Sequence, residues 1–269
     1  MASLANKSVV KVGRAKFVFV LCHFDASLVI VFVNLRKIFV PISISGDNLS
    51  RLASGMMSMG LESWYDAHVM PRLVTLACSQ GQIMKRRSML VPLASGSVFE
   101  LGCGGGLNQQ FYQDSLVSSF AGIDPHEGLL EDARAHARAR GWENEIRAGV
   151  GEDIPFPAGQ FDTVVCTYTL CSVDDPKKVL SEIKRVLKLG GRMLFLEHGK
   201  APDENVHQWQ ERIEPYWKRM AGGCHLTRPI GSALRGAGFE VEPLGQGYLP
   251  KTPRIAGWME WGVARKAGA

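Results

Sequence analysis

Cysteine is scarce in this 269-residue chain, and no two of its six cysteines form a CxxC pair. They lack the dense spacing that staples small secreted domains, so we expect reduced thiols and a cytoplasmic location. One conceivable set of metal ligands is Cys166, Cys171, Cys224 and His225. Because their spacing offers no second close pair, it is poor for zinc, and the sequence predicts no metal site.

An excess of one charge sign is also missing from most of the chain. Residues 1–45 hold six basic residues and one acidic residue, which accounts for the whole formal net charge of +5. From residue 46 onward, 25 basic residues balance 25 acidic ones. A nucleic-acid groove needs a clustered positive field, so this balance argues against nucleic acid as a partner and favours a small molecule.

A long uninterrupted apolar run is absent too, although residues 17–33 come near to one, with 14 apolar residues out of 17. A bilayer span needs about 20 apolar residues, and His23 and Asp25 stand near the middle, so a transmembrane helix is marginal. The segment beginning at Asn34 does not resemble a signal-peptide cleavage site. A peripheral membrane anchor and a misread start codon upstream of Met56 are the open alternatives.

Beyond this leader, the hydrophobic pattern alternates between strand and helix periods. Strands are predicted at residues 97–101, 117–124, 145–149, 161–168, 192–198, 239–244 and 255–265, and helices at 61–92, 107–113, 127–140, 176–189, 204–220 and 230–237. Strands that alternate with helices are typical of a parallel sheet covered on both faces. The sequence therefore predicts one α/β domain at residues 60–269, separate from a leader at residues 1–45.

A glycine-rich turn follows the first predicted strand of this domain. A dinucleotide site requires GxGxxG, but Leu107 stands where the third glycine would follow Gly102 and Gly104. Counted from its acidic residue, Glu100-x-Gly102-x-Gly104-x-Gly106 resembles the loop of class I methyltransferases, which use S-adenosylmethionine. Because that cofactor carries a cationic amino group and a sulfonium, an acid helps here where it would repel a pyrophosphate.

Two further segments complete the predicted cofactor site. Asp124 ends the second strand, where a carboxylate can accept hydrogen bonds from both hydroxyls of a ribose. Residues 149–156 resemble the adenine-binding stretch of the same superfamily, with Val150 at its usual acidic position. The resemblance implies that adenine is held by apolar contact with Val150 and by backbone groups of Gly151 and Glu152.

Two later blocks carry a closer resemblance, VVCTYTLCSVDDPKKVLSEIKRVLKLGGRMLFLEHG and WQERIEPYWKRMAGGCHLTRP. They resemble a bacterial group of class I methyltransferases similar to the animal membrane-associated proteins that S-methylate small alkyl thiols. The resemblance implies a Rossmann-like fold whose seven-stranded mixed sheet has an antiparallel last strand. It also implies that six residues at the carboxyl edge of the sheet face cofactor or acceptor: Thr167, Tyr168, Leu170, Cys171, Glu197 and His198.

Whether methyl transfer needs a catalytic base depends on the acceptor. Most of the acceleration comes from holding acceptor and methyl group in line inside a dry site. A thiol needs little help because its pKa is about 8.5, whereas an alcohol or phenol needs a positioned base. His198 at a strand end and His225 in a later loop are the candidate bases, although His198 suits a structural hydrogen bond equally well.

Three classes of function fit these motifs. The first is methylation of a small acceptor, with a thiol favoured over a lipid, a quinone or another oxygen, carbon or nitrogen acceptor. The second is a nicotinamide-dependent oxidoreductase, which Leu107 disfavours. The third is a module that binds S-adenosylmethionine without catalysis, because no single residue is indispensable for methyl transfer.

Overall fold

The computed structural model describes four strands near the N-terminus and then residues 70–142 and 144–266. The four strands are β1 (Ser8–Val10), β2 (Phe17–Phe24), β3 (Ser27–Asn34) and β4 (Pro41–Ser45). The chain divides into two compact units, Met1–Tyr65 and Asp66–Ala269. Because the second unit carries the glycine loop and every later motif, it holds the candidate site. The predicted boundaries at residues 45 and 60 stay a prediction.

The first unit is an antiparallel sheet with the strand order β1-β2-β3-β4. The apolar stretch at residues 17–33 is divided between β2 and β3, which pair with Phe24 opposite Ser27. This stretch is rich in β-branched and aromatic residues, which favour a strand over a helix. None of the described helices is long and apolar enough to span a bilayer. The transmembrane helix considered for this stretch is thus not found in the described residues.

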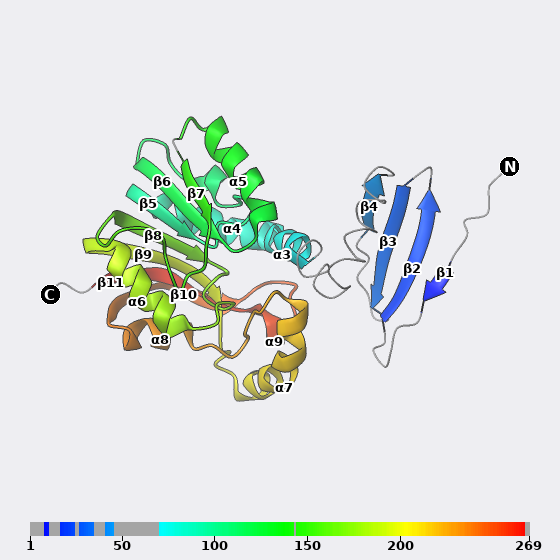
Figure 1. The fold of residues 1–269 in the computed structure, drawn as a ribbon. Coiled ribbons are helices and arrows are strands. Elements are labelled where there is room, and N and C mark those ends of the chain that lie inside the picture. The colour runs from blue at the N-terminus through cyan, green and yellow to red at the C-terminus, as the bar shows by residue number, and fades with distance from the viewer. Residues whose placement is uncertain are drawn as a thin grey trace. The chain divides into compact units, whose positions relative to one another are not determined.

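The second unit is built on a seven-stranded sheet with the order β10-β11-β9-β8-β5-β6-β7 (Figure 1). Its strands are β5 (Gly96–Leu101), β6 (Val117–Asp124), β7 (Asn144–Ala148), β8 (Phe161–Thr167), β9 (Leu187–His198), β10 (Phe239–Tyr248) and β11 (Trp258–Lys266). The first five are parallel, and β11 pairs antiparallel with both β9 and β10. The prediction of a mixed sheet with an antiparallel last strand is confirmed.

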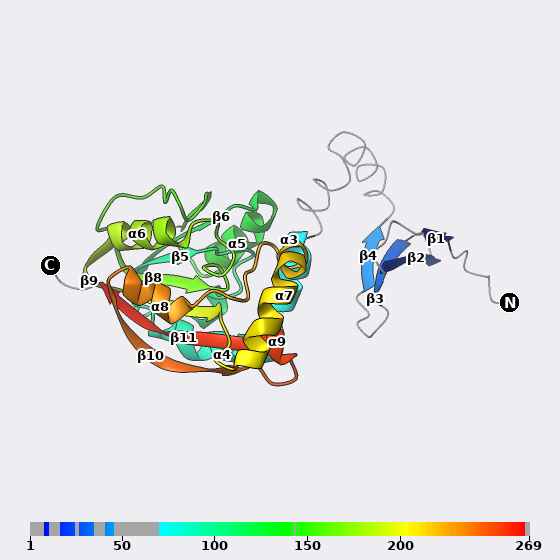
Figure 2. The same cartoon turned by 90° about the horizontal axis from the view of Figure 1, so that it is seen from below.

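Helices cover both faces of this sheet, as the sequence predicts. They are α3 (Met70–Cys78), α4 (Gly81–Leu90), α5 (Glu127–Ala139), α6 (Pro176–Val186), α7 (Glu204–Met220), α8 (Ile230–Gly236) and α9 (Arg254–Gly257). One core joins Phe99 and Leu101 of β5 to α6 and α8, and the other joins Val98 to α4 and α5. Alternate residues of one strand therefore face opposite layers, as the two-residue period of a strand requires. Helix α7 lies beside α9 at one end of the sheet (Figure 2).

Three predicted elements differ from the structure. Residues 107–113 form only the short 3-10 helix η2 (Gln109–Phe111), because the Asn108 side chain turns into the core and bonds there. The helix predicted to reach residue 189 ends at Val186, and Leu187 opens β9. The last predicted strand begins with the four-residue helix α9 before β11. In the described part of residues 61–92, α3 and α4 are separate helices with a break before Gly81.

Candidate functional site

A cavity of about 450 Å³ lies at the carboxyl edge of β5, β6 and β8, within the usual size range of small-molecule sites. Its lining comes from α3 and α4 (Met70, Pro71, Val74, Thr75, Cys78, Arg87), the loop after β5 (Glu100 to Gly105, Leu107), the end of β6 (Ile123 to His126, Leu129), the loop after β7 (Gly149 to Glu152), the loop after β8 (Thr167 to Thr169, Ser172 to Asp174) and Gly222 with Gly223. Because the strands are parallel, the loops that follow them lie at the same edge of the sheet, and such sheets bind ligands at that edge.

The glycine loop after β5 has a backbone that other residues would not adopt easily. Gly102, Gly104 and Gly106 have φ angles of +70°, +49° and +83°. A Cβ atom at Gly102 would clash with the Thr169 side chain, and one at Gly106 would come within 3.2 Å of α5. A Cβ atom at Gly104 would meet nothing nearer than Asp124 Oδ2 at 3.9 Å. Gly104 therefore leaves space free on the cavity side, where a ligand can approach the backbone closely.

Asp124 ends β6 with its carboxylate at the cavity wall and only 7% of its surface exposed. Its Oδ2 accepts a hydrogen bond from the backbone N–H of Gly104 at 2.9 Å, and its Oδ1 accepts one from that of His126 at 2.9 Å. The bond to Gly104 ties the end of β6 to the glycine loop. The Nδ1 atom of the His126 ring also lies 3.2 Å from Oδ1, so the free acceptor site of this carboxylate is the second lone pair of Oδ2.

Glu100 lies behind the glycine loop and is almost fully buried. Its Oε1 accepts a hydrogen bond from Asn108 Nδ2 at 2.9 Å, and its Oε2 accepts one from the Tyr112 hydroxyl at 2.9 Å. Burial raises the pKa of this carboxyl to about 7, while the bonds from Tyr112 and Asn108 and the charge of Arg87 lower it. A cation bound in the cavity would favour the ionised form further.

Arg87 and Asn108 complete a buried polar network with Glu100. Arg87 donates from Nη1 to Asn108 Oδ1 and to Thr167 Oγ1, both at 2.6 Å, and Asn108 Nδ2 donates to Thr167 Oγ1 at 2.9 Å. The Arg87 guanidinium also lies over the Tyr168 ring, 5.1 Å from its centre. Neither Arg87 nor Asn108 is predicted from the sequence. The helical period could have predicted that Arg87 is buried, because it places Arg87 on the same face of α4 as Ile83 and Leu90.

The segment predicted to hold adenine forms another wall of the cavity. Val150 is 47% exposed and lines the cavity, so its apolar side chain is open to a ligand. A Cβ atom at Gly151 would come within 3.1 Å of Val179, so this backbone packs directly on the core. Glu152 Oε1 accepts from the backbone N–H groups of Asp174 and Asp175 at 3.0 and 3.1 Å. Glu152 therefore joins this segment to the loop after β8.

The two candidate bases are not among the described residues that line the cavity. His198 ends β9 and packs edge-on against the Tyr168 ring, with 5.1 Å between ring centres. His225 instead lies 2.9 Å, through its Nδ1, from Glu214 Oε1 on α7. Their catalytic role stays a prediction, and for His225 the geometry favours holding its own loop.

The six residues expected to face cofactor or acceptor divide into two groups. Thr167 and Tyr168 line the cavity, and Tyr168 has a positive φ of 58°. Leu170, Cys171 and Glu197 are buried instead, and His198 is half-buried. The Glu197 carboxylate accepts from the backbone N–H groups of Thr169 and Cys171, both at 3.0 Å. Glu197 thus shapes the loop after β8, and the expectation that it faces a ligand does not fit this geometry.

Comparison of the chain with known proteins identifies related sequences. Residues 99–195 match the family model of a methyltransferase domain. The human thiol S-methyltransferase TMT1B is 41% identical over 174 residues, which cover 61% of this chain and 71% of that protein. Human thiol S-methyltransferase TMT1A is 32% identical over 194 residues, covering 67% of this chain and 79% of that protein.

The chain belongs to the class I methyltransferase family that includes TMT1A and TMT1B. It is an S-adenosylmethionine-dependent methyltransferase, and this finding does not favour the oxidoreductase or the module without catalysis. A solved geranyl diphosphate methyltransferase in complex with S-adenosylmethionine is similar at a TM-score of 0.52 and 15% identity, covering 70% of this chain and 92% of that one. At that identity the likeness shows the fold alone.

The stability of the methyltransferase is expected to depend on pH through Glu100. Its pKa is raised by burial from 4.5 to about 7, so the folded state binds the proton more tightly than the unfolded state. Stability therefore falls as pH rises from 4.5 to 7, by about 3 kcal/mol in this one contribution. The change Glu100→Gln removes the ionisable group, so the variant should lack this fall.

Urea unfolding of both proteins across that pH range measures the effect as the difference between two stability curves. The matched control is Glu145→Gln, which changes an exposed carboxylate on β7 and should follow the wild-type curve. Parallel curves for wild type and Glu100→Gln would contradict the raised pKa.

Proposed function

We propose that the acceptor of this methyltransferase is a small thiol, so that the product is a methyl thioether. The single observation that carries the proposal is the 41% identity to a human thiol S-methyltransferase over 71% of that protein's length. The balanced charge of the chain beyond residue 45 also suits a small acceptor. Fold likeness contributes nothing to this choice, because one fold serves many substrates.

We expect S-adenosylmethionine to bind at the end of the cavity whose walls are the glycine loop, Asp124 and Val150. The fit rests on three features of these walls. Gly104 leaves open space beside the backbone, Oδ2 of Asp124 keeps a free acceptor site, and the Glu100 carboxyl places negative charge behind the loop. These features match hydroxyl groups and a cationic amino group. When bound, S-adenosylmethionine supplies the activated methyl group.

Five residues complete this assignment of the cofactor site. Gly102 and Gly106 fix the loop backbone, Gly151 and Glu152 present backbone groups beside Val150, and Thr167 closes the network behind the loop. No residue in this set has to change protonation during the reaction. Their task is to bind and orient.

The acceptor end is assigned to the remaining walls, formed by α3, Tyr168 and the loop after α7. Met70, Val74 and Cys78 of α3 line the cavity there together with Gly223. This lining is largely apolar, so it suits the hydrocarbon part of a small thiol and excludes water around the sulfur. A thiol that enters as its thiolate attacks in line, and the chain then needs only to hold it in place.

The pH dependence of turnover tests whether the chain supplies a base. With S-adenosylmethionine saturating, kcat/KM for a thiol acceptor is expected to rise about tenfold per pH unit up to the pKa of that thiol, about 8.5 for an alkyl thiol. A more acidic thiol should move the break in the profile by the difference between the two pKa values. A break that stays at one pH for both thiols would reveal a base in the enzyme.

The matched control for that profile is His225→Ala, because the His225 ring lies against Glu214 and is not among the residues that line the cavity. This variant should keep the same dependence on the acceptor pKa as the wild-type enzyme.

We further assign catalysis to residues 60–269, and peripheral contact of residues 1–45 with anionic membranes stays a prediction. Sedimentation of the full chain with anionic and with neutral vesicles tests that contact.

A further inference from the structure

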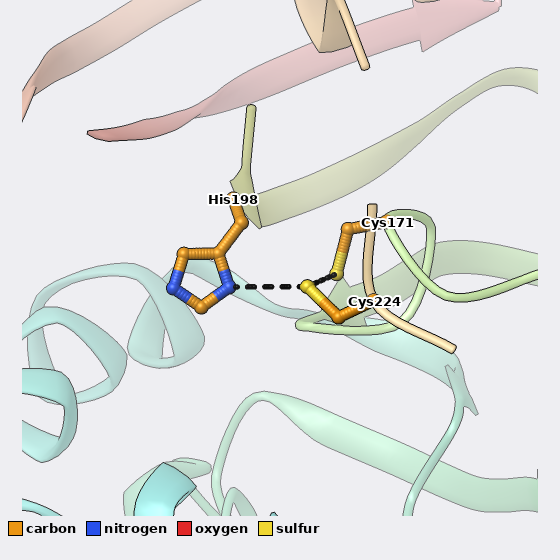
Figure 3. Close-up of side chains that lie close together, drawn as sticks. All are labelled: Cys171, His198 and Cys224. Carbon is orange, nitrogen blue, oxygen red and sulfur yellow. Dashed lines mark hydrogen bonds between the residues drawn. The ribbon is translucent and has the colours of Figure 1, made fainter. Parts of the chain in front are cut away.

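Two thiols and an imidazole converge beside the cavity from three separate parts of the chain (Figure 3). Cys171 lies in the loop after β8, His198 ends β9, and Cys224 lies in the loop after α7. Cys224 Sγ is 3.6 Å from Cys171 Sγ and 3.7 Å from His198 Nδ1. All three ligand atoms lie within 4.8 Å of one another.

The two separations from Cys224 Sγ match two edges of a metal coordination tetrahedron. With Zn–S bonds of about 2.3 Å and a Zn–N bond of about 2.0–2.1 Å, tetrahedral angles place two sulfurs ~3.8 Å apart and a sulfur and a nitrogen ~3.6 Å apart. The two observed separations lie within about 0.2 Å of these values. We propose that Cys171, His198 and Cys224 bind a thiophilic divalent metal ion, with Zn²⁺ as the expected ion.

The type of donor supports this choice of metal. The cluster offers two sulfurs and one imidazole nitrogen, a set that favours zinc-like ions over calcium or magnesium, which prefer oxygen ligands. The nearby carboxylate of Glu197 already accepts bonds from two backbone N–H groups and from the Cys166 thiol at 3.4 Å. Binding of Zn²⁺ displaces the two thiol protons to solvent, so the bound site holds two thiolates and a neutral imidazole.

The backbone around the cluster holds the ligands in position. The His225 N–H donates to the Cys171 carbonyl at 2.8 Å, which ties the loop after α7 to the loop after β8. The Cys171 N–H is fixed by Glu197, and the Cys224 N–H donates to the Ala221 carbonyl at 3.2 Å. A set of ligands that is held before the ion arrives loses less entropy on binding.

Three protein ligands leave a fourth position on the ion. Zinc sites that keep such a position bind water or substrate there, whereas closed structural sites use four protein ligands. Ser172 and Gly223, the immediate neighbours of Cys171 and Cys224, line the cavity. The proposed ion therefore lies next to the cavity, although its binding does not depend on a thiol being the methyl acceptor.

Elemental analysis of the full chain tests the proposal, provided that it is purified without a polyhistidine tag or chelator. We expect about one zinc per chain. Apoprotein kept reduced and titrated with Co²⁺ should show a thiolate-to-cobalt absorption band. Cys171→Ser, Cys224→Ser and His198→Ala should each weaken metal binding about tenfold or more, since even changes next to metal ligands have effects of that size.

Cys166→Ser is the matched control, because a serine hydroxyl can still donate to Glu197 and the cluster is untouched. It should bind metal like the wild-type chain. If the variants fail to fold, the wild-type measurements still decide the question. Wild-type protein with no zinc and no cobalt band after reduction would overturn the proposal, and so would a Cys171–Cys224 disulfide whose reduced form binds neither ion.

Discussion

Replacing Asp124 with alanine is expected to weaken S-adenosylmethionine binding at least about a hundredfold. The change removes a carboxylate at the cavity wall that is assigned to two ribose hydroxyls, and hydrogen bonds to a charged acceptor contribute about 1.5–3 kcal/mol each. It also frees the N–H groups of Gly104 and His126, which loosens the loop. Isothermal titration of the full chain with S-adenosylmethionine and with S-adenosylhomocysteine measures the loss.

The control for this change is Asp132→Ala, since Asp132 is an exposed residue of the neighbouring helix α5. It should bind the cofactor as the wild-type chain does. Asp124→Asn should lie between alanine and wild type, because one amide oxygen can still accept from Gly104. Wild-type affinity in a folded Asp124→Ala protein would remove Asp124 from the cofactor site.

A methyl group added at Gly104 is expected to block the cofactor while the fold survives. The φ angle of +49° makes Gly104→Ala cost about 1–2 kcal/mol of stability, but its Cβ atom meets no protein atom nearer than 3.9 Å. The methyl would instead occupy space that we assign to the ligand. Overpacking a contact costs about 1–3 kcal/mol, which predicts a loss of roughly 5- to 150-fold in affinity.

Gly141→Ala separates backbone strain from ligand blocking. Gly141 follows α5 with φ +70°, and a Cβ atom there would meet nothing within 4 Å, so the strain is matched at a residue that does not line the cavity. Both variants should lose similar stability in thermal melts, yet only Gly104→Ala should lose cofactor affinity in isothermal titration. Equal affinities in the two variants would show that the ligand does not approach Gly104.

Local sequence signals predicted the sheet because each one has a direct physical cause. Strands such as 161–168 and 192–198 contain short apolar runs, at residues 164–166 and 193–196, and a buried parallel strand requires that pattern. The glycine loop was predicted for a similar reason, since positive φ angles at Gly102, Gly104 and Gly106 restrict those positions. The helix expected after this loop was wrong because helical period alone did not reveal that Asn108 bonds inward to Glu100.

The parts of the site that escaped prediction depend on contacts between distant segments. Arg87 stands in a run of basic residues that looks like an exposed face, yet it reaches Thr167, 80 residues further along the chain. The proposed metal site escaped for the same reason. The sequence groups Cys224 with its neighbour His225, whereas the fold brings Cys224 to His198 and turns His225 toward Glu214.

The central claim is that this methyltransferase uses S-adenosylmethionine to methylate sulfur. The most direct test offers the purified full chain two acceptors with the same carbon skeleton, an alkyl thiol and the corresponding alcohol, and follows methylated products by mass spectrometry together with S-adenosylhomocysteine release. We predict a methyl thioether from the thiol and no ether from the alcohol. Methylation of the alcohol at the rate of the thiol, or no product from any thiol despite tight cofactor binding, would contradict it.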